Sequence, residues 1–197
     1  MAGNPIIKAV ADFVSALDEL GIRYYAGGSV ASSIHGVARY TGDVDLIADL
    51  APQQTESLAA KLNTDFYADA GQMREALRYG RAFNAIHFTT GFKIDVFPLR
   101  NDAFHAGELA RAEKRVWEVD HTGSVELRVA SAEDTILEKL VWYKRSGETS
   151  DHQWSDVLGV ATTRRLDREY LREWAPKLGV ADLLERLFGE AGQIHPK

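Results

Sequence analysis

The pattern of apolar residues changes near residue 130, and this change determines the predicted fold class. Before it, amphipathic helical segments alternate with short apolar runs whose spacing is typical of strands. After it, Ser131 and two acidic residues form a typical helix start. The segments that follow are all predicted helical, over 132–145, 152–162, 167–178 and 181–188. The chain is therefore predicted to be α+β, with a mixed sheet and helices over 1–130 and a helical C-terminal part over 131–197.

Two hairpins are the clearest elements of the first part. Residues 83–88 and 92–97 alternate apolar and polar side chains on either side of Thr90-Gly91. A second pair of strands is predicted over 116–119 and 125–129. The other elements predicted there are strands over 23–26 and 43–47 and helices over 5–20, 29–35, 52–62 and 103–114.

The composition excludes several classes of protein. The 197 residues are 45% hydrophobic and 26% charged, which is enough apolar material for a globular core. The absence of cysteine excludes disulfide scaffolds, cysteine zinc sites and thiol nucleophiles. A net charge of −6 argues against a protein that coats nucleic acid over its whole surface, but leaves room for a local basic groove. Without a signal peptide or an apolar run that could span a bilayer, we expect a soluble, cytoplasmic protein with no membrane partner.

Three features could carry chemistry, and the first is Gly27-Gly28-Ser29 between a predicted strand and a predicted helix. Glycines there let the backbone approach a ligand, and the free N–H groups of a helix start attract a phosphate. A tight turn capped by serine explains the same residues, and on this feature alone it is the better interpretation.

The second feature is the pair Asp43 and Asp45. Residues two apart on a strand project from the same face, so both carboxylates point into one small volume. Such charges repel each other unless a cation lies between them, and Mg²⁺ or Mn²⁺ is the natural ligand of oxygen donors. The apolar neighbours favour an internal strand. Exposed acids on an edge strand are the alternative.

The third feature is Asp95, in the middle of an apolar strand. An aspartate is costly to bury without a partner. If its strand lies beside that of Asp45, three carboxylates surround a two-metal site of the kind that clamps the oxygens of a phosphoryl displacement. The alternation with Lys93 and Phe97 also permits an Asp95 that faces solvent.

Together, the order and spacing of these residues resemble the nucleotidyltransferase superfamily, with its polymerase β-like fold. Gly27-Gly28-Ser29, a short helix and Arg39-x-Thr41-x-Asp43-x-Asp45 resemble the first motif of its AbiEii-like branch, which includes toxins of toxin–antitoxin systems. Residues 133–140 and 153–157 resemble the helical motif of that branch, in which a lysine and an aspartate on consecutive helices serve the nucleotide site. Gln153 departs from the pattern, so no role is implied for it. The likeness spans about residues 26–157.

The resemblance implies a role for each matching residue. Asp43 and Asp45 would hold both metal ions, Mg²⁺ or Mn²⁺, and Asp95 would complete the site and help to deprotonate the attacking hydroxyl. The nucleotide-binding residues implied are Gly27, Gly28, Ser29, Arg39, Thr41 and Lys139, with Asp156 orienting Lys139. A surface salt bridge is the alternative for Arg39, and an ordinary interhelical salt bridge is the alternative for Lys139 and Asp156.

The activity implied is the transfer of an NMP group from an NTP to an acceptor hydroxyl. The resemblance suggests a tRNA 3′ end as acceptor and a toxin with a cognate antitoxin protein as the biological role. A small-molecule acceptor such as an antibiotic is the second hypothesis, and a non-catalytic module that binds a nucleotide or a partner protein is the third. The basic residues after residue 130 would line a groove for an RNA end or form solvated helix faces.

Overall fold

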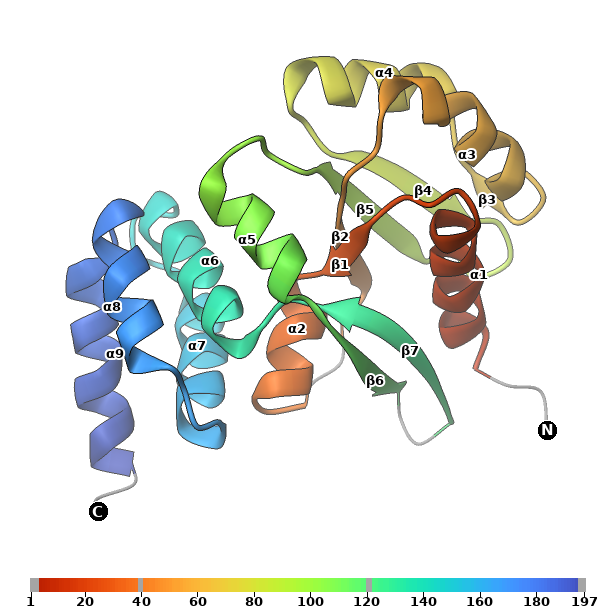
Figure 1. The fold of residues 1–197 in the computed structure, drawn as a ribbon. Helices are drawn as coiled ribbons and strands as arrows, with labels where there is room; N and C mark the ends of the chain where they lie inside the picture. Colours follow the sequence, from red (N-terminus) through yellow and green to blue (C-terminus); the bar gives the residue numbers. More distant parts are fainter. Residues whose placement is uncertain (1–3, 39–40, 120–121, 195–197) are drawn as a thin grey trace. The chain divides into compact units, whose positions relative to one another are not determined.

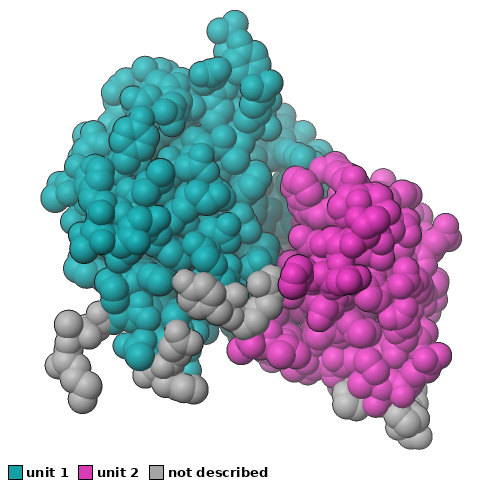
Figure 2. All heavy atoms as spheres, turned by 180° about the vertical axis from the view of Figure 1, so that it is seen from behind, with its two compact units in different colours: residues 1–30, 40–129 teal, residues 31–39, 130–197 magenta. Residues whose placement is uncertain are grey.

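The structure is a computed structural model, described for residues 4–38, 41–119 and 122–194 (Figure 1). It divides into two compact units, coloured separately in Figure 2. Unit 1 comprises residues 1–30 and 40–129, and unit 2 comprises residues 31–39 and 130–197. The predicted division assigned the whole of 1–130 to one part. Residues 31–39, which include the second half of the helix predicted over 29–35, instead group with the C-terminal helices.

Unit 1 contains a mixed sheet, which is the predicted class of fold. Its described strands follow the order β3-β4-β5-β2-β1-β7-β6, with β2 parallel to β5 and β1 parallel to β7. The other neighbours are antiparallel. The strands are β1 Tyr24–Ala26, β2 Asp43–Ala48, β3 Phe66–Tyr67, β4 Phe83–His87, β5 Lys93–Pro98, β6 Glu113–Val119 and β7 Gly123–Val129.

The central strands bury one face completely and the other only in part. Val44, Leu46 and Ile94 are fully buried and alternate with the more polar side chains of β2 and β5. On this apolar face Phe13 of α1 (Pro5–Glu19) packs edge-on against Phe66, with ring centroids 5.6 Å apart. Helices α3 (Thr55–Leu62) and α4 (Ala70–Tyr79) follow in the same layer, and a short 3-10 helix, η1 (Pro52–Gln54), precedes α3.

The opposite face is the one that carries the polar side chains of β2 and β5. Helix α5 (Ala103–Arg111) covers it at β1, where the hydroxyl of Tyr25 donates to the buried carboxylate of Glu108 at 2.8 Å. Tyr25 is the register partner of Ile47, which lies on the same face as Asp43 and Asp45.

Unit 2 is helical, as predicted. It contains α6 Ala132–Arg145, α7 Asp151–Thr163, α8 Arg168–Lys177, α9 Ala181–Ile194 and the end of α2, which runs over Gly28–His35. Leu137, Leu140, Val157 and Leu187 are fully buried in it. The caps follow the sequence: the Ser131 hydroxyl accepts from the Asp134 amide, and the Ser150 hydroxyl accepts from the Gln153 amide. Among the described residues, no helix combines the length and apolar character needed to cross a bilayer.

Three parts of the secondary structure differ from the prediction. Strand β3 and helix α4 lie in 63–82, where the sequence pattern predicts no element. Helix α4 is polar on average and its buried residues are Ala70, Met73 and Ala76, so it has few of the large apolar residues that mark the other helices. Helix α5 ends at Arg111 and not at residue 114, because the next residues pair with β7. Helix α9 continues to Ile194, six residues beyond the predicted end at 188.

Candidate functional site

The three predicted carboxylates lie on one face of the sheet. Strand β2 is internal, between β5 and β1, and its register places Asp45 directly opposite Asp95 and Asp43 opposite Lys93. Neighbouring strands are about 4.8 Å apart, so Asp95 is one strand spacing from Asp45 and Asp43 is one pleat along the strand. The condition for a three-carboxylate cluster, that the strand of Asp95 lies beside that of Asp45, is therefore met. The three side chains are named the sheet carboxylates below.

Two further polar residues, neither of them predicted, contact Asp95. The amide of Asn84 on β4 donates to one carboxylate oxygen, and the ammonium of Lys93 lies 2.5 Å from the other. Both share the face of Asp95, because Asn84 is its register partner and Lys93 is two residues away on the same strand. The alternation of apolar and polar residues in the predicted hairpin, over 83–88 and 92–97, is the sequence signal that could have placed Asn84 and Lys93 on the face of Asp95. Asp95 itself is buried at 9% exposure, so it neither faces open solvent nor lacks partners.

The negative charge of the sheet carboxylates affects the pKa of Lys93. The hydrogen bond from its ammonium to Asp95 raises the pKa of Lys93, although burial lowers it, and the charges of Asp95, Asp43 and Asp45 raise it further. A half-exposed lysine therefore experiences the negative potential of all three carboxylates. A cation held among them is stabilised for the same reason.

The turn that precedes β2 supports Asp43. The buried hydroxyl of Thr41 lies 3.0 Å from the carbonyl oxygen of Asp43 and 3.3 Å from its carboxylate, and can donate to either. Thr41 thus contacts a sheet carboxylate directly. Arg39, the other nucleotide-binding residue predicted in this loop, lies outside the described residues.

The glycine turn runs closely past Asp45. The Gly27 amide donates to the carbonyl oxygen of Asp45 at 3.0 Å, and Gly28, the first residue of α2, has a φ of +51°. A Cβ atom on Gly28 would lie 1.9 Å from a carboxylate oxygen of Asp45. A side chain at Gly28 would therefore displace the Asp45 carboxylate and be strained by the positive φ. Ser29 follows in the first turn of α2, at the helix end that favours an anion.

Unit 2 holds the predicted pair of Lys139 and Asp156. The Lys139 ammonium lies 2.7 Å from the Asp156 carboxylate, and the two side chains are only 6% and 9% exposed. The Gln153 side-chain oxygen accepts from the same ammonium at 3.2 Å, and the Ser32 hydroxyl donates to Asp156 at 3.2 Å. The interhelical ion pair is therefore formed and largely enclosed. Gln153, for which the resemblance implies no role, belongs to it.

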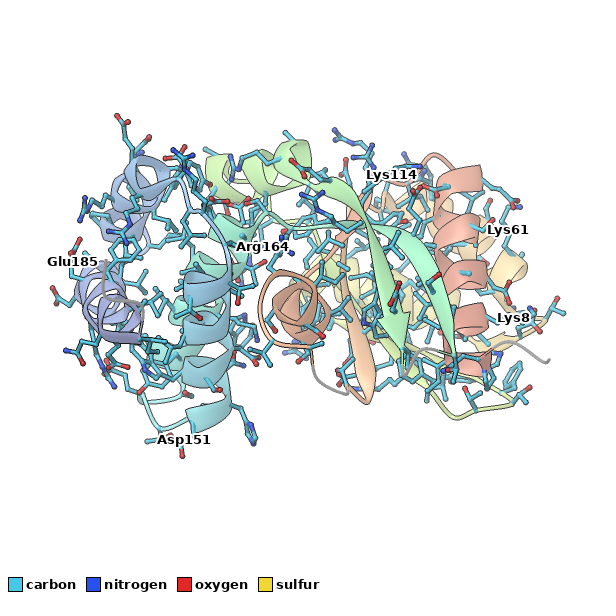
Figure 3. All side chains as sticks on the ribbon, turned by 90° about the horizontal axis from the view of Figure 1, so that it is seen from below. Lys8, Lys61, Lys114, Asp151, Arg164 and Glu185 are labelled. Carbon is cyan, nitrogen blue, oxygen red and sulfur yellow. The ribbon has the colours of Figure 1, made fainter. Side chains whose placement is uncertain are left out.

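The basic residues predicted as a possible RNA groove mostly contact their own unit. Arg164, labelled in Figure 3, donates from the end of α7 to the carbonyl oxygens of Ile34 and His35, which closes the end of α2. The guanidinium groups of Arg168 and Arg172 lie over the ring of Phe188, at 4.6 and 5.6 Å from its centroid. These contacts stabilise the helical packing of unit 2.

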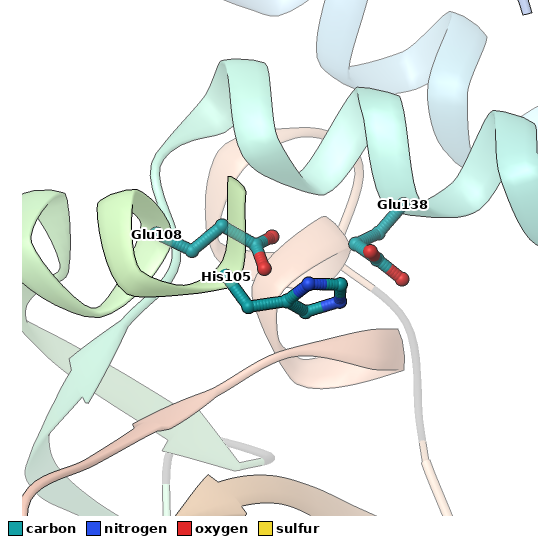
Figure 4. Close-up of side chains that lie close together, drawn as sticks. All are labelled: His105, Glu108 and Glu138. Atoms are coloured by element: carbon teal, nitrogen blue, oxygen red, sulfur yellow. The ribbon is translucent and has the colours of Figure 1, made fainter. Parts of the chain in front are cut away.

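A buried acidic residue on α5 had no clear sequence signal. Glu108 is fully buried and accepts from Tyr25, while His105, one turn earlier, contacts Asp102 at 2.8 Å. Figure 4 shows His105 and Glu108 projecting from α5; Glu138, also labelled there, belongs to α6 of unit 2. The spacing of three residues in a short helix is too common to predict this arrangement.

The sheet carboxylates have the chemistry of a divalent metal site. They supply three carboxylate groups from two adjacent strands, and hard oxygen donors suit Mg²⁺ and Mn²⁺. The charges of these carboxylates also raise the pKa of the neighbouring Lys93. The residues present therefore fit the predicted metal.

Comparisons with known proteins identify the fold. No family model and no curated protein matches the sequence. Two structures of the antibiotic-resistance factor ANT(2″)-Ia are similar to it: a crystal structure in complex with adenylyl-2″-tobramycin has a TM-score of 0.54 at 15% identity, over 89% of this chain and 98% of that chain. A solution structure has a TM-score of 0.52 at 16% identity, over all of both chains. An antigenic nucleotidyltransferase-like protein from Paracoccidioides brasiliensis has a TM-score of 0.56 at 18% identity, over 98% of this chain and 90% of that chain. The chain has the nucleotidyltransferase fold, and the predicted fold class is confirmed.

Proposed function

We propose that the protein is a metal-dependent nucleotidyltransferase that moves an NMP group from an NTP to an acceptor hydroxyl. The observation that carries the proposal is the register of β2 and β5, which places Asp43, Asp45 and Asp95 on one sheet face, with the Gly27-Gly28 turn against Asp45. Carboxylates of like charge are costly to gather unless a cation uses them. The nucleotidyltransferase fold supports the same reaction class.

Asp43 and Asp45 would hold Mg²⁺ or Mn²⁺, with Asp95 completing the ligand set. A bound divalent ion supplies positive charge for the oxygens of the reacting phosphate. Gly28 and Ser29 would bind the triphosphate through their backbone N–H groups and the serine hydroxyl, while the Gly27 amide holds the turn against the carbonyl oxygen of Asp45. Thr41 keeps Asp43 in position through its hydroxyl contact.

The acceptor hydroxyl would approach Asp95, whose carboxylate accepts its proton. A bond forms between the acceptor oxygen and the α-phosphorus, and the bond from the α-phosphorus to the oxygen that bridges to the β-phosphorus breaks. Pyrophosphate leaves with both electrons of that bond. Asn84 positions the Asp95 carboxylate for this proton transfer through its hydrogen bond.

The acceptor is proposed to be a tRNA 3′ end, and the biological role that of an AbiEii-like toxin neutralised by an antitoxin protein. The support for both is the resemblance of Arg39-x-Thr41-x-Asp43-x-Asp45 and of the Lys139 and Asp156 helices to that branch. The complex of ANT(2″)-Ia with adenylyl-2″-tobramycin makes an antibiotic the second candidate acceptor.

The test uses each of the four NTPs labelled at the α-phosphate, with Mg²⁺ and either total tRNA or a panel of aminoglycosides. Label incorporated into RNA by the wild type and lost in Asp43→Asn supports the proposal. Label in an aminoglycoside identifies the second acceptor. Binding of NTP with no transfer to either acceptor, under conditions in which the protein is folded, favours a non-catalytic module.

A further inference from the structure

The face of the sheet carboxylates continues across β4 to the edge strand β3. Register aligns four residues in one row: Asp43 opposite Lys93, Lys93 opposite Ile86, and Ile86 opposite Tyr67. Paired residues of neighbouring strands point to the same side. Tyr67 therefore lies three strand spacings, about 14 Å, from Asp43 on the same face of unit 1.

Large apolar side chains are exposed at the far end of this row. Tyr67 is 49% exposed, Ile86 41% and Phe88, in the turn directly after β4, 60%. The Phe88 amide donates to the Asp65 carbonyl oxygen at 2.9 Å, which keeps this residue beside the start of β3. The three residues are named the apolar shelf. The side chains between them, Phe66 and His87, are buried on the opposite face, so the exposure belongs to one side of these strands.

The shelf lies on the side from which an acceptor would approach. The Gly27–Ser29 turn follows β1, which neighbours β2 on one side, whereas β5, β4 and β3 extend from the other side. In a phosphoryl displacement the attacking and leaving oxygens are in line on opposite sides of the phosphorus. If pyrophosphate leaves toward the glycine turn, the acceptor oxygen arrives past Asp95, across β5 and β4.

We infer that the apolar shelf binds the 3′-terminal bases of a single-stranded RNA acceptor by stacking. This inference rests on the proposed function. The rings of Tyr67 and Phe88 offer the aromatic surfaces on which bases stack irrespective of sequence. Lys93, 43% exposed, places an ammonium group between the shelf and the sheet carboxylates, where a terminal backbone phosphate would pass.

Lys93 is the register partner of Ile86 and places a cationic group beside the shelf. Exposed aromatic side chains beside a cationic group are typical of surfaces that bind single strands.

The experiment measures binding of a fluorescent single-stranded RNA oligonucleotide with a free 3′ hydroxyl by the full chain, without NTP. The Tyr67→Ala/Phe88→Ala variant should bind it about 5-fold to 150-fold more weakly for each stacked base lost. Tyr67→Phe and Phe88→Tyr keep the rings and should bind as the wild type does. Val116→Ala, which truncates an exposed apolar side chain on β6, is the matched control.

Binding and transfer separate this inference from the proposed function. Equal RNA binding by the wild type and the double alanine variant overturns the inference, as does a wild type that binds no RNA. Weaker aminoglycoside binding in the double variant, with RNA binding unchanged, also overturns it. Loss of RNA binding in the double variant, together with absence of nucleotidyl transfer by the wild type, supports the shelf and contradicts the proposed reaction.

Discussion

The two units arrange their charged side chains differently. Unit 1 gathers three carboxylates on a sheet face, with a half-exposed lysine as the neighbouring cation. Unit 2 encloses one carboxylate with one ammonium, and Gln153 and Ser32 add hydrogen bonds to them. Among the described residues, the first arrangement places three carboxylates beside one ammonium, whereas the second pairs one carboxylate with one ammonium.

This difference distinguishes the candidate ligand site of unit 1 from the structural ion pair of unit 2. A bound cation would compensate the charge of the sheet carboxylates, which is why they support the proposed metal site. A buried pair with matched charges and additional hydrogen bonds needs no ligand. These contacts favour the interpretation of Lys139 and Asp156 as an interhelical salt bridge, while their role in binding phosphate stays a prediction.

The largest expected effect comes from breaking the balanced pair. Lys139→Met leaves the Asp156 carboxylate enclosed without its cation and should lower the free energy of unfolding by about 3–5 kcal/mol. Urea unfolding followed by helical circular dichroism measures this. Lys177→Met, which breaks an exposed pair with Glu173 in the same unit, is the control and should cost at most about 1 kcal/mol.

The double variant Lys139→Met/Asp156→Leu distinguishes the two roles of the pair. If the pair is structural, removing both charges should restore most of the lost stability, and nucleotidyl transfer should return with it. A double variant that is stable but inactive, with a raised KM for NTP, would establish that Lys139 binds phosphate.

Asp45→Asn should have the next largest effect, on activity and not on stability. Removing one of the sheet carboxylates should lower kcat by about 100-fold to 1000-fold, the usual cost of losing one electrostatic group at a reacting centre. The free energy of unfolding should stay the same or rise, because like charges no longer oppose each other. Asp49→Asn, which removes an exposed acid paired with Arg23, should leave both quantities nearly unchanged.

Gly28→Ala should have an intermediate effect on stability. The added Cβ meets the Asp45 carboxylate and the residue must keep a positive φ, which together should cost about 1–3 kcal/mol. Thermal unfolding and NTP binding measure it. Gly42→Ala, at a nearby glycine with open space around its Cα, is the matched control; an equal loss in both variants would contradict a special role for the Gly28 turn.

Lys93→Met should have the smallest effect. The half-exposed ammonium competes with a metal ion for Asp95, so its removal should tighten binding of Mn²⁺. The expected gain is at most about fivefold, which corresponds to the free energy of about 1 kcal/mol that an exposed ion pair contributes. Isothermal titration measures the affinity. Weaker Mn²⁺ binding in this variant would mean that Lys93 holds Asp95 in place for the metal and does not compete with it.

The sequence predicted those parts of the site that depend on local pattern. The period of two in β2 put Asp43 and Asp45 on one face, and the change of pattern near residue 130 predicted the helical part. The proximity of Asp95 to Asp45 depends on the parallel pairing of two strands that are far apart in the chain, and periodicity alone does not determine this pairing. The family resemblance supplied what the local pattern lacked.

The unpredicted parts are those that arise from tertiary packing. Asn84 and Lys93 reach Asp95 only when the hairpin register is known. The end of α2 groups with unit 2 because Ser32 contacts Asp156 and Arg164 caps the helix, and both partners come from a helix more than a hundred residues later. Helix α4 was not predicted because it is polar on average and two of its three buried residues are alanines.

The most direct test of the central claim is pyrophosphate release from α-labelled NTP by the wild type and by Asp95→Asn, with Mg²⁺ and tRNA present. The account predicts release matched by label in the RNA for the wild type, and a loss of about 100-fold or more in a variant that still folds and binds NTP. Equal release by Asp95→Asn, or no release by a folded wild type with any NTP and either class of acceptor, would contradict it.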